Sequence, residues 1–186
     1  MCRFLVVLFA LCASLSFADE RNDPAHHGGD ELGLPTVYDA QGKVVGPLEV
    51  YSGVNGVYLD IDGRVVFVEV DHKRIGPSQY SASQYEWVAA TFVPYPSLDC
   101  SGSAAVADTG SPTPAMPLRE GADVTVYIAG TEVSGDVQVW SVKTIDASTG
   151  VATCETNSFD EGGPYWPTKS TYPLTQHFPE PLRVAY

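Results

Sequence analysis

One stretch decides the fold class: Gly56-Val57-Tyr58-Leu59-Asp60-Ile61-Asp62-Gly63-Arg64-Val65-Val66-Phe67-Val68-Glu69-Val70. β-Branched and aromatic side chains dominate both halves of this stretch, and such side chains fit the pleated surface of a β-strand. Asp62-Gly63 divides the halves, and this pair favours a two-residue turn between antiparallel strands. The stretch therefore predicts a β-hairpin.

Similar short runs recur at intervals of about ten residues, each closed by glycine, proline, aspartate or serine. They cover residues 36–39 and 43–46, residues 123–128, and residues 137–145 and 151–154. No window carries a sustained apolar face at helical spacing, and the nearest candidate, residues 81–91, also fits an irregular strand. The proline-rich residues 111–118 predict a surface loop. We therefore predict an all-β fold, an antiparallel sandwich or open barrel of short strands with proline-rich loops.

The first 18 residues have the features of a secretory signal peptide. Arg3 precedes an apolar run at residues 4–13, and Ser16 and Ala18 are the small residues that a signal peptidase reads. The run is shorter than the ~20 residues that cross a bilayer, and no other stretch approaches that length. Residues 19–34 predict a flexible tail and residues 35–186 a single β-rich domain. We expect a secreted or periplasmic protein without a transmembrane segment.

The mature chain keeps two cysteines, Cys100 and Cys154. Two cysteines in an exported protein most often pair, so we expect a disulfide between them. A zinc site is the alternative, but neither cysteine lies in a C-x-x-C motif or has a histidine at ligand spacing. Residues 60–63 resemble the start of a calcium loop, but Arg64 and Val65 stand where an EF-hand needs a ligand and a glycine. No metal ion or other cofactor is predicted.

The chain is strongly acidic, with 10 Lys+Arg against 23 Asp+Glu and a formal net charge of −13 at pH 7. A negative surface repels the phosphates of nucleic acids and anionic lipid headgroups. Nucleic acids are therefore excluded from the expected partners.

One short motif suggests catalysis. Asp108-Thr109-Gly110-Ser111 follows an apolar run, as the catalytic aspartate does in aspartic peptidases, which the motif resembles. That chemistry needs two aspartates sharing a proton, and the sequence holds no second Asp-Thr-Gly or Asp-Ser-Gly. Ordinary turn chemistry also explains the motif. A hydrolase that uses Asp108 is therefore the alternative hypothesis. For nucleophilic catalysis by a serine, His72 and His177 are the candidate general bases, but Ser101 and Ser103 lack the G-x-S-x-G motif that such catalysis needs.

Ten tyrosines and three tryptophans in an acidic exported protein suggest carbohydrate binding. Aromatic faces stack on sugar rings, and acidic or amide groups hold the hydroxyls. Tyr165, Trp166 and Tyr172 lie in the proline-rich C-terminal region, so we predict that they contact a ligand. The alternative is that these side chains fill the core or its rim.

Four segments together carry a resemblance: residues 37–47, 99–104, 146–154 and 178–184. Their order resembles a group of uncharacterised exported bacterial proteins and tail-associated modules. The resemblance implies an extracytoplasmic β-rich module with paired cysteines, and it carries no catalytic residues to transfer. The sequence therefore predicts a binding or structural role rather than catalysis, with a glycan, a protein or another cell-surface ligand as the partner.

Overall fold

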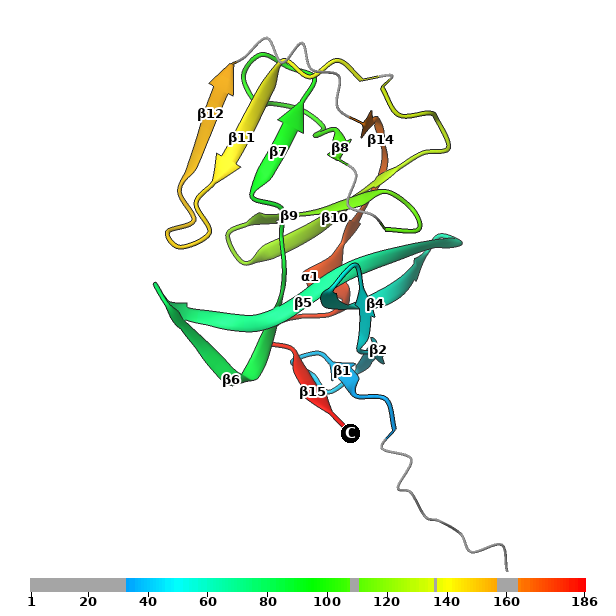
Figure 1. The fold of residues 1–186 in the computed structure, drawn as a ribbon, viewed down its shortest axis with the longest axis vertical. Coiled ribbons are helices and arrows are strands. Elements are labelled where there is room, and N and C mark those ends of the chain that lie inside the picture. Colours follow the sequence, from blue (N-terminus) through cyan, green and yellow to red (C-terminus); the bar gives the residue numbers. More distant parts are fainter. Residues whose placement is uncertain (1–32, 108–110, 136, 157–163) are drawn as a thin grey trace, which may run out of the picture. The chain divides into compact units, whose positions relative to one another are not determined.

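The described part of the chain folds into antiparallel β-sheets joined by turns, with one single-turn helix (Figure 1). The computed structural model describes residues 33–107, 111–135, 137–156 and 164–186. The chain divides into two units, and all of these residues belong to the second, Leu32–Tyr186. The described sheets are antiparallel and none closes into a barrel, so the predicted all-β class is confirmed. The predicted signal peptide and nearly all of the predicted tail lie outside the described residues.

Two sheets contain the strands of the N-terminal half, in the orders β15-β1-β2 and β3-β4-β5-β6. Asp62 and Gly63, in the turn between β4 and β5, have φ values of 53° and 76°, the positive values that a two-residue hairpin turn requires. The Asp60 carboxylate accepts a hydrogen bond of 2.8 Å from the Gly63 amide. The predicted hairpin is therefore confirmed. The strands are β1 (Thr36–Tyr38), β2 (Val44–Pro47), β3 (Glu49–Tyr51), β4 (Val54–Ile61), β5 (Arg64–Gly76), β6 (Gln79–Trp87) and β15 (Arg183–Ala185).

Three further sheets have the orders β12-β11-β7, β14-β10-β9 and β13-β8. Their strands are β7 (Phe92–Tyr95), β8 (Val106–Ala107), β9 (Ala115–Glu120), β10 (Asp123–Ala129), β11 (Ser141–Ile145), β12 (Ala152–Thr156), β13 (Tyr165–Trp166) and β14 (Thr168–Pro173). The helix α1 (Leu174–His177) follows β14 directly. Across the described ranges, no helix has the length and apolar character of a membrane-spanning segment.

The predicted surface loop over residues 111–118 is wrong in its second half. Strand β9 begins at Ala115, and the side chain of Met116 is only 1% exposed. Proline is tolerated here because β9 is the edge strand of its sheet, where a missing amide leaves no ladder partner unpaired. The Pro117 carbonyl on this edge accepts a hydrogen bond of 2.8 Å from the Ala90 amide. Burial of apolar side chains therefore outweighs the turn preference of the prolines.

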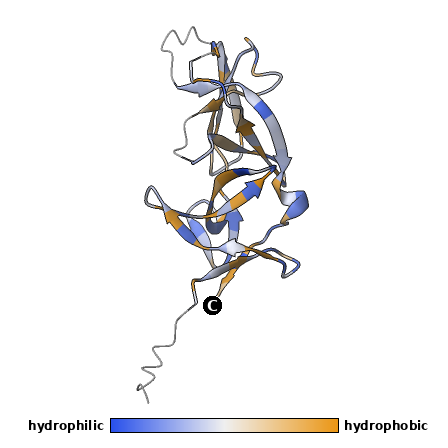
Figure 2. Ribbon diagram, turned by 90° about the vertical axis from the view of Figure 1, so that its right-hand side faces the viewer, coloured by the Kyte–Doolittle hydropathy of each residue, from blue (hydrophilic) through white to orange (hydrophobic). Residues whose placement is uncertain are grey.

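The sheet β14-β10-β9 contributes to two apolar clusters, because alternate side chains of a strand point to opposite faces. Val124, Val126 and Ile128 of β10 are fully buried in a first cluster, together with side chains of β4 and β5. Ala129 and Met116 belong to a second cluster, together with side chains of β7. Hydrophobic and hydrophilic residues are accordingly intermingled along the strands (Figure 2). One sheet thus joins two cores.

The predicted disulfide between Cys100 and Cys154 is present. It ties the loop that follows β7 to the edge strand β12, all five residues of which are exposed. The Cys100 amide donates a hydrogen bond of 2.9 Å to the buried Ser141 hydroxyl, and the Thr156 hydroxyl donates one of 2.8 Å to the Leu98 carbonyl. The loop and the edge strand are therefore joined by covalent and polar contacts.

The turn between β11 and β12 is closed by the Asp146 carboxylate. One of its oxygens accepts hydrogen bonds from the Ser148 hydroxyl (2.6 Å) and from the Ser148 and Thr149 amides (2.8 Å each). These bonds, above all the one from the Ser148 hydroxyl, lower the pKa of Asp146 to about 2 from its usual 3.8. The charged carboxylate is therefore the form that holds the turn.

We predict that a carbon-detected NMR titration will find the Asp146 pKa near 2. Because the folded pKa lies below the unfolded one, the contribution to stability is complete above the usual 3.8 and is lost as the pH falls through about 2. Ser148→Ala should return the pKa toward its usual value. An Asp146 pKa of 3.8 in the unaltered protein would contradict the prediction.

Candidate functional site

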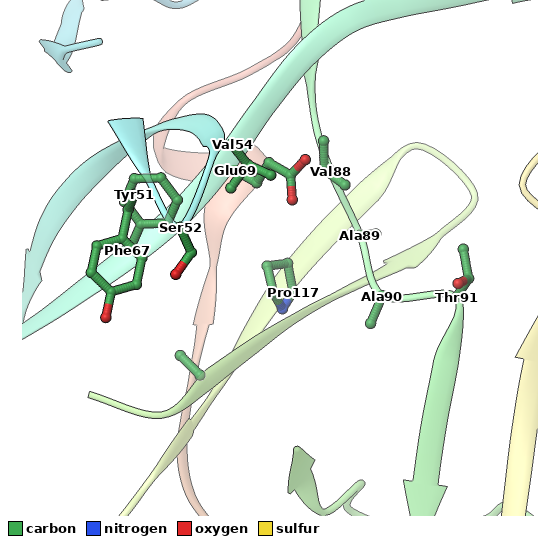
Figure 3. Close-up of a pocket in the computed structure, with 11 residues that line it drawn as sticks. Tyr51, Ser52, Val54, Phe67, Glu69, Val88, Ala89, Ala90, Thr91 and Pro117 are labelled. Carbon is green, nitrogen blue, oxygen red and sulfur yellow. The ribbon is translucent and has the colours of Figure 1, made fainter. Parts of the chain in front are cut away.

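A cavity with a volume of about 320 Å³ opens between four segments of the chain, and we call it the aromatic pocket. This volume is near the lower end of the range for small-molecule sites, roughly 300–1,000 Å³. Four segments line it: the end of β3 with the turn into β4, strand β5, the connection between β6 and β7, and strand β9 (Figure 3). The lining residues are Tyr51, Ser52, Val54, Phe67, Glu69, Val88, Ala89, Ala90, Thr91, Ala115 and Pro117.

Aromatic rings form one wall of the pocket. The ring centroids of Tyr51 and Phe67 are 5.3 Å apart, and Tyr58 lies behind them with its centroid 5.1 Å from that of Phe67. Figure 3 shows the rings of Tyr51 and Phe67 side by side at one end of the pocket, with Pro117 and Ala90 toward the other. Tilted and edge-on ring contacts of this kind are favourable, so the wall is already formed without a ligand.

The wall depends on a glycine in the neighbouring strand. A Cβ atom built on Gly56 of β4 would lie 2.5 Å from Cζ of Phe67 and 2.4 Å from the carbonyl oxygen of Val68. Both distances are shorter than any van der Waals contact, so a side chain here would displace the Phe67 ring or separate β4 from β5. Gly56 therefore lets the Phe67 ring lie flat over the hairpin.

Glu69 is the one charged residue among the lining residues. It follows Phe67 by two residues along β5, so the two side chains share a face of the strand. No hydrogen bond or ion pair holds its carboxylate within the part of the chain that the structure describes. Burial raises the pKa of Glu69, and the negative charge of Asp71 raises it further. The pocket therefore offers a partly desolvated acceptor that no described protein group satisfies.

The connection between β6 and β7 forms the opposite side of the pocket. The Val88 amide donates a hydrogen bond of 3.0 Å to the Glu69 carbonyl, and the Ala90 amide binds the Pro117 carbonyl. The Thr91 carbonyl accepts a bond of 2.8 Å from the Ile145 amide. These bonds hold the connection to three different strands, and the small side chains along it leave room for the cavity.

A second cavity of about 250 Å³, which we call the charged cleft, shares residues Val88, Ala89, Ala90 and Thr91 with the aromatic pocket. Its charged groups already have partners. The Arg74 guanidinium donates to the Tyr80 hydroxyl (2.8 Å) and to a backbone carbonyl, and Arg119 forms an ion pair of 2.7 Å with Glu180. The cleft therefore offers fewer unsatisfied groups to a ligand than the aromatic pocket does.

Tyr165, Trp166 and Tyr172, the predicted ligand-binding aromatics, are half-buried and pack against three different apolar clusters. Tyr172 stacks on His177 with ring centroids 4.3 Å apart. None of the three lines the aromatic pocket. Their contact with a ligand therefore stays a prediction.

The candidate catalytic groups are Asp108, His72 and His177. Asp108 lies outside the residues that the structure describes, so the hydrolase alternative stays a prediction. His72 stacks on Tyr85, and its Nδ1 lies 2.8 Å from the Ser81 carbonyl oxygen. Among the described residues, no group of three His, Cys, Asp or Glu side chains could hold a metal ion.

Tyr51, Phe67 and Glu69 belong to no sequence motif and were not predicted as site residues. The signal that could have found two of them is the alternation within β5, where Val66, Val68 and Val70 are buried and the intervening residues face the other way. An aromatic and an acidic residue two positions apart on that second face indicate a surface that binds a ligand through both ring contacts and polar contacts. Tyr51 carries no such signal, because only the fold brings it beside Phe67.

No protein-family model, curated protein or solved structure matches the chain. The resemblance to exported bacterial modules therefore stays a prediction. The β-rich fold and the paired cysteines that it implies are both present.

Proposed function

We propose that this protein is an exported binding module whose aromatic pocket holds one sugar ring of a glycan. The observation that carries the proposal is the aromatic wall of Tyr51 and Phe67 in the same pocket as the unsatisfied Glu69 carboxylate. Aromatic faces pack against the C–H faces of sugars, while carboxylate and hydroxyl oxygens hold the sugar hydroxyls.

The size and lining of the pocket favour a single sugar ring over an extended oligosaccharide as the ligand. Its volume of about 320 Å³ suits a small ligand, and apolar residues form most of its surface. The hydroxyls of Ser52 and Thr91 lie on the lining with Glu69, so polar groups are available from three segments. The terminal ring of a glycan and a free monosaccharide both present hydroxyls and C–H faces to such a pocket.

Export to the cell surface or the periplasm agrees with this role. The predicted signal peptide directs the chain to an oxidising compartment, and the Cys100–Cys154 disulfide is stable there. The formal charge of −13 keeps such a module away from anionic surfaces and leaves neutral or cationic ligands as partners.

The proposal is tested by titrating the purified protein with a panel of neutral hexoses and hexosamines. Binding is followed by the chemical shifts of the Tyr51 and Phe67 ring protons and by calorimetry. We expect saturable shifts that are confined to the aromatic pocket. Shifts confined to Tyr165, Trp166 and Tyr172 would instead favour the C-terminal surface, and no binding across the panel would overturn the proposal.

Tyr51→Ala should weaken binding of the sugar about tenfold, because it removes half of the aromatic wall at a cost of about 1.4 kcal/mol. Tyr51→Phe keeps the ring and should bind like the unaltered protein. Tyr186→Ala is the matched control, since Tyr186 is 84% exposed and does not line the pocket. An unchanged Kd in Tyr51→Ala, measured by calorimetry, would show that the ligand does not stack on this wall.

A further inference from the structure

We propose that the ligand of the aromatic pocket carries an ammonium group, as an amino sugar with a free amine does, and that Glu69 is its counter-ion. This inference rests on the proposed function and names its ligand class more narrowly. It follows from the charges that line the pocket, from the position of Glu69 on the same face of β5 as Phe67 and from the missing partner of the Glu69 carboxylate.

The charges around the pocket exclude an anionic ligand. The β3–β4 turn, the β6–β7 connection and β9 contribute only uncharged side chains to the lining, and β5 contributes Glu69. No lysine, arginine or histidine stands among the lining residues. The charged neighbour that acts on Glu69 is Asp71, which is also acidic. The local field is therefore negative and attracts a cation.

The position of the carboxylate suits a cation on a ring. Phe67 and Glu69 point to the same face of β5 and line the same cavity, so a ring amine that pairs with the carboxylate enters the pocket that holds the aromatic wall. In Figure 3 the Glu69 carboxylate lies near Val88, and the rings of Tyr51 and Phe67 lie at one end of the pocket. Aromatic faces attract cations through their quadrupole, so the rings and the carboxylate reinforce each other.

The unsatisfied state of Glu69 also favours a cationic ligand. Burial and Asp71 both disfavour its charged form and raise its pKa, and no described group compensates. A bound ammonium supplies the missing opposite charge and donates the hydrogen bonds that the carboxylate lacks. A neutral hydroxyl donates a hydrogen bond but leaves the charge unpaired.

The test compares two ligands that differ in one group, glucosamine with its ammonium and glucose with a hydroxyl at the same position. Calorimetry near neutral pH should find that glucosamine binds about tenfold more tightly than glucose. Glu69→Gln should abolish this preference, so that the variant binds glucosamine and glucose with affinities within twofold of each other. Glu155→Gln is the matched control, because Glu155 is exposed on β12 and does not line the pocket. NMR should also show the Glu69 pKa falling when glucosamine binds.

Each outcome separates this inference from the proposed function. Equal affinities for the two sugars, or a preference that survives in Glu69→Gln, would overturn the ammonium inference and leave a neutral sugar site. Cyclohexylamine, a ring amine without hydroxyls, tests whether the pocket binds an ammonium group without the rest of a sugar. Binding of cyclohexylamine that requires Glu69, with neither sugar binding, would support the counter-ion role and overturn the sugar proposal. Absence of binding by all three probes would overturn both.

Discussion

Loss of the Cys100–Cys154 disulfide is expected to lower the free energy of unfolding by about 4 kcal/mol. The bond closes a loop across a sequence separation of 54 residues, and opening it releases that loop in the unfolded chain. It also joins the edge strand β12 to the loop after β7, and among the described strands β12 pairs with β11 alone. Chemical denaturation of the Cys100→Ser, Cys154→Ser double variant measures the loss.

The reduced, unaltered protein is the control for this variant. Cys100 is only 8% exposed, so a serine there adds the cost of burying a hydroxyl to the loss of the bond. The reduced protein keeps both sulfur atoms and isolates the effect of the bond itself. Equal denaturation midpoints for the oxidised and reduced protein would contradict the prediction.

Glu180→Ala is expected to lower the free energy of unfolding by about 3 kcal/mol. The Glu180 carboxylate accepts hydrogen bonds from both terminal nitrogens of Arg119 (2.9 and 2.7 Å) and from the Trp87 amide (2.6 Å). Burial alone lowers the pKa of Arg119, but the hydrogen bonds and charge of Glu180 outweigh it and raise the pKa. Removal of the carboxylate leaves a guanidinium that is 27% exposed without its counter-charge.

The Glu180→Gln variant distinguishes the charge from the hydrogen bonds. An amide oxygen still accepts from the Trp87 amide, so the loss should be intermediate. Glu155→Ala, which removes an exposed glutamate from β12, should leave stability unchanged within about 0.5 kcal/mol. A loss below about 1 kcal/mol in Glu180→Ala would show that the pair behaves like an ordinary surface salt bridge.

The contacts of Glu180 also bear on the aromatic pocket. Trp87 is the last residue of β6 and directly precedes the connection that lines the pocket, and Arg119 lies on β9, two residues after Pro117. The Arg119 guanidinium donates a further bond of 2.7 Å to the Trp87 carbonyl. The C-terminal segment thus holds one end of the connection in place through side chains far apart in the sequence.

Part of the candidate site follows from the hairpin that the sequence predicts. The alternation along β5 places Phe67 and Glu69 on one face, and the register of the hairpin places Gly56 opposite Glu69. Tyr51 and Pro117 join them only through contacts with distant segments. Pro117 in particular belongs to a stretch whose prolines favour a loop, and burial of Met116 beside it turns that stretch into a strand.

The sequence by itself determined what short-range chemistry controls. β-Branched and aromatic runs make strands, Asp62-Gly63 makes the hairpin turn, and two cysteines left after the predicted signal peptide have only each other as partners. Only the tertiary structure decided where a ligand could bind, because the pocket forms where four segments between residues 51 and 117 meet. Contacts between these four segments depend on how the two apolar clusters pack around one sheet. No local sequence pattern specifies the spatial distance between segments that are far apart in the sequence.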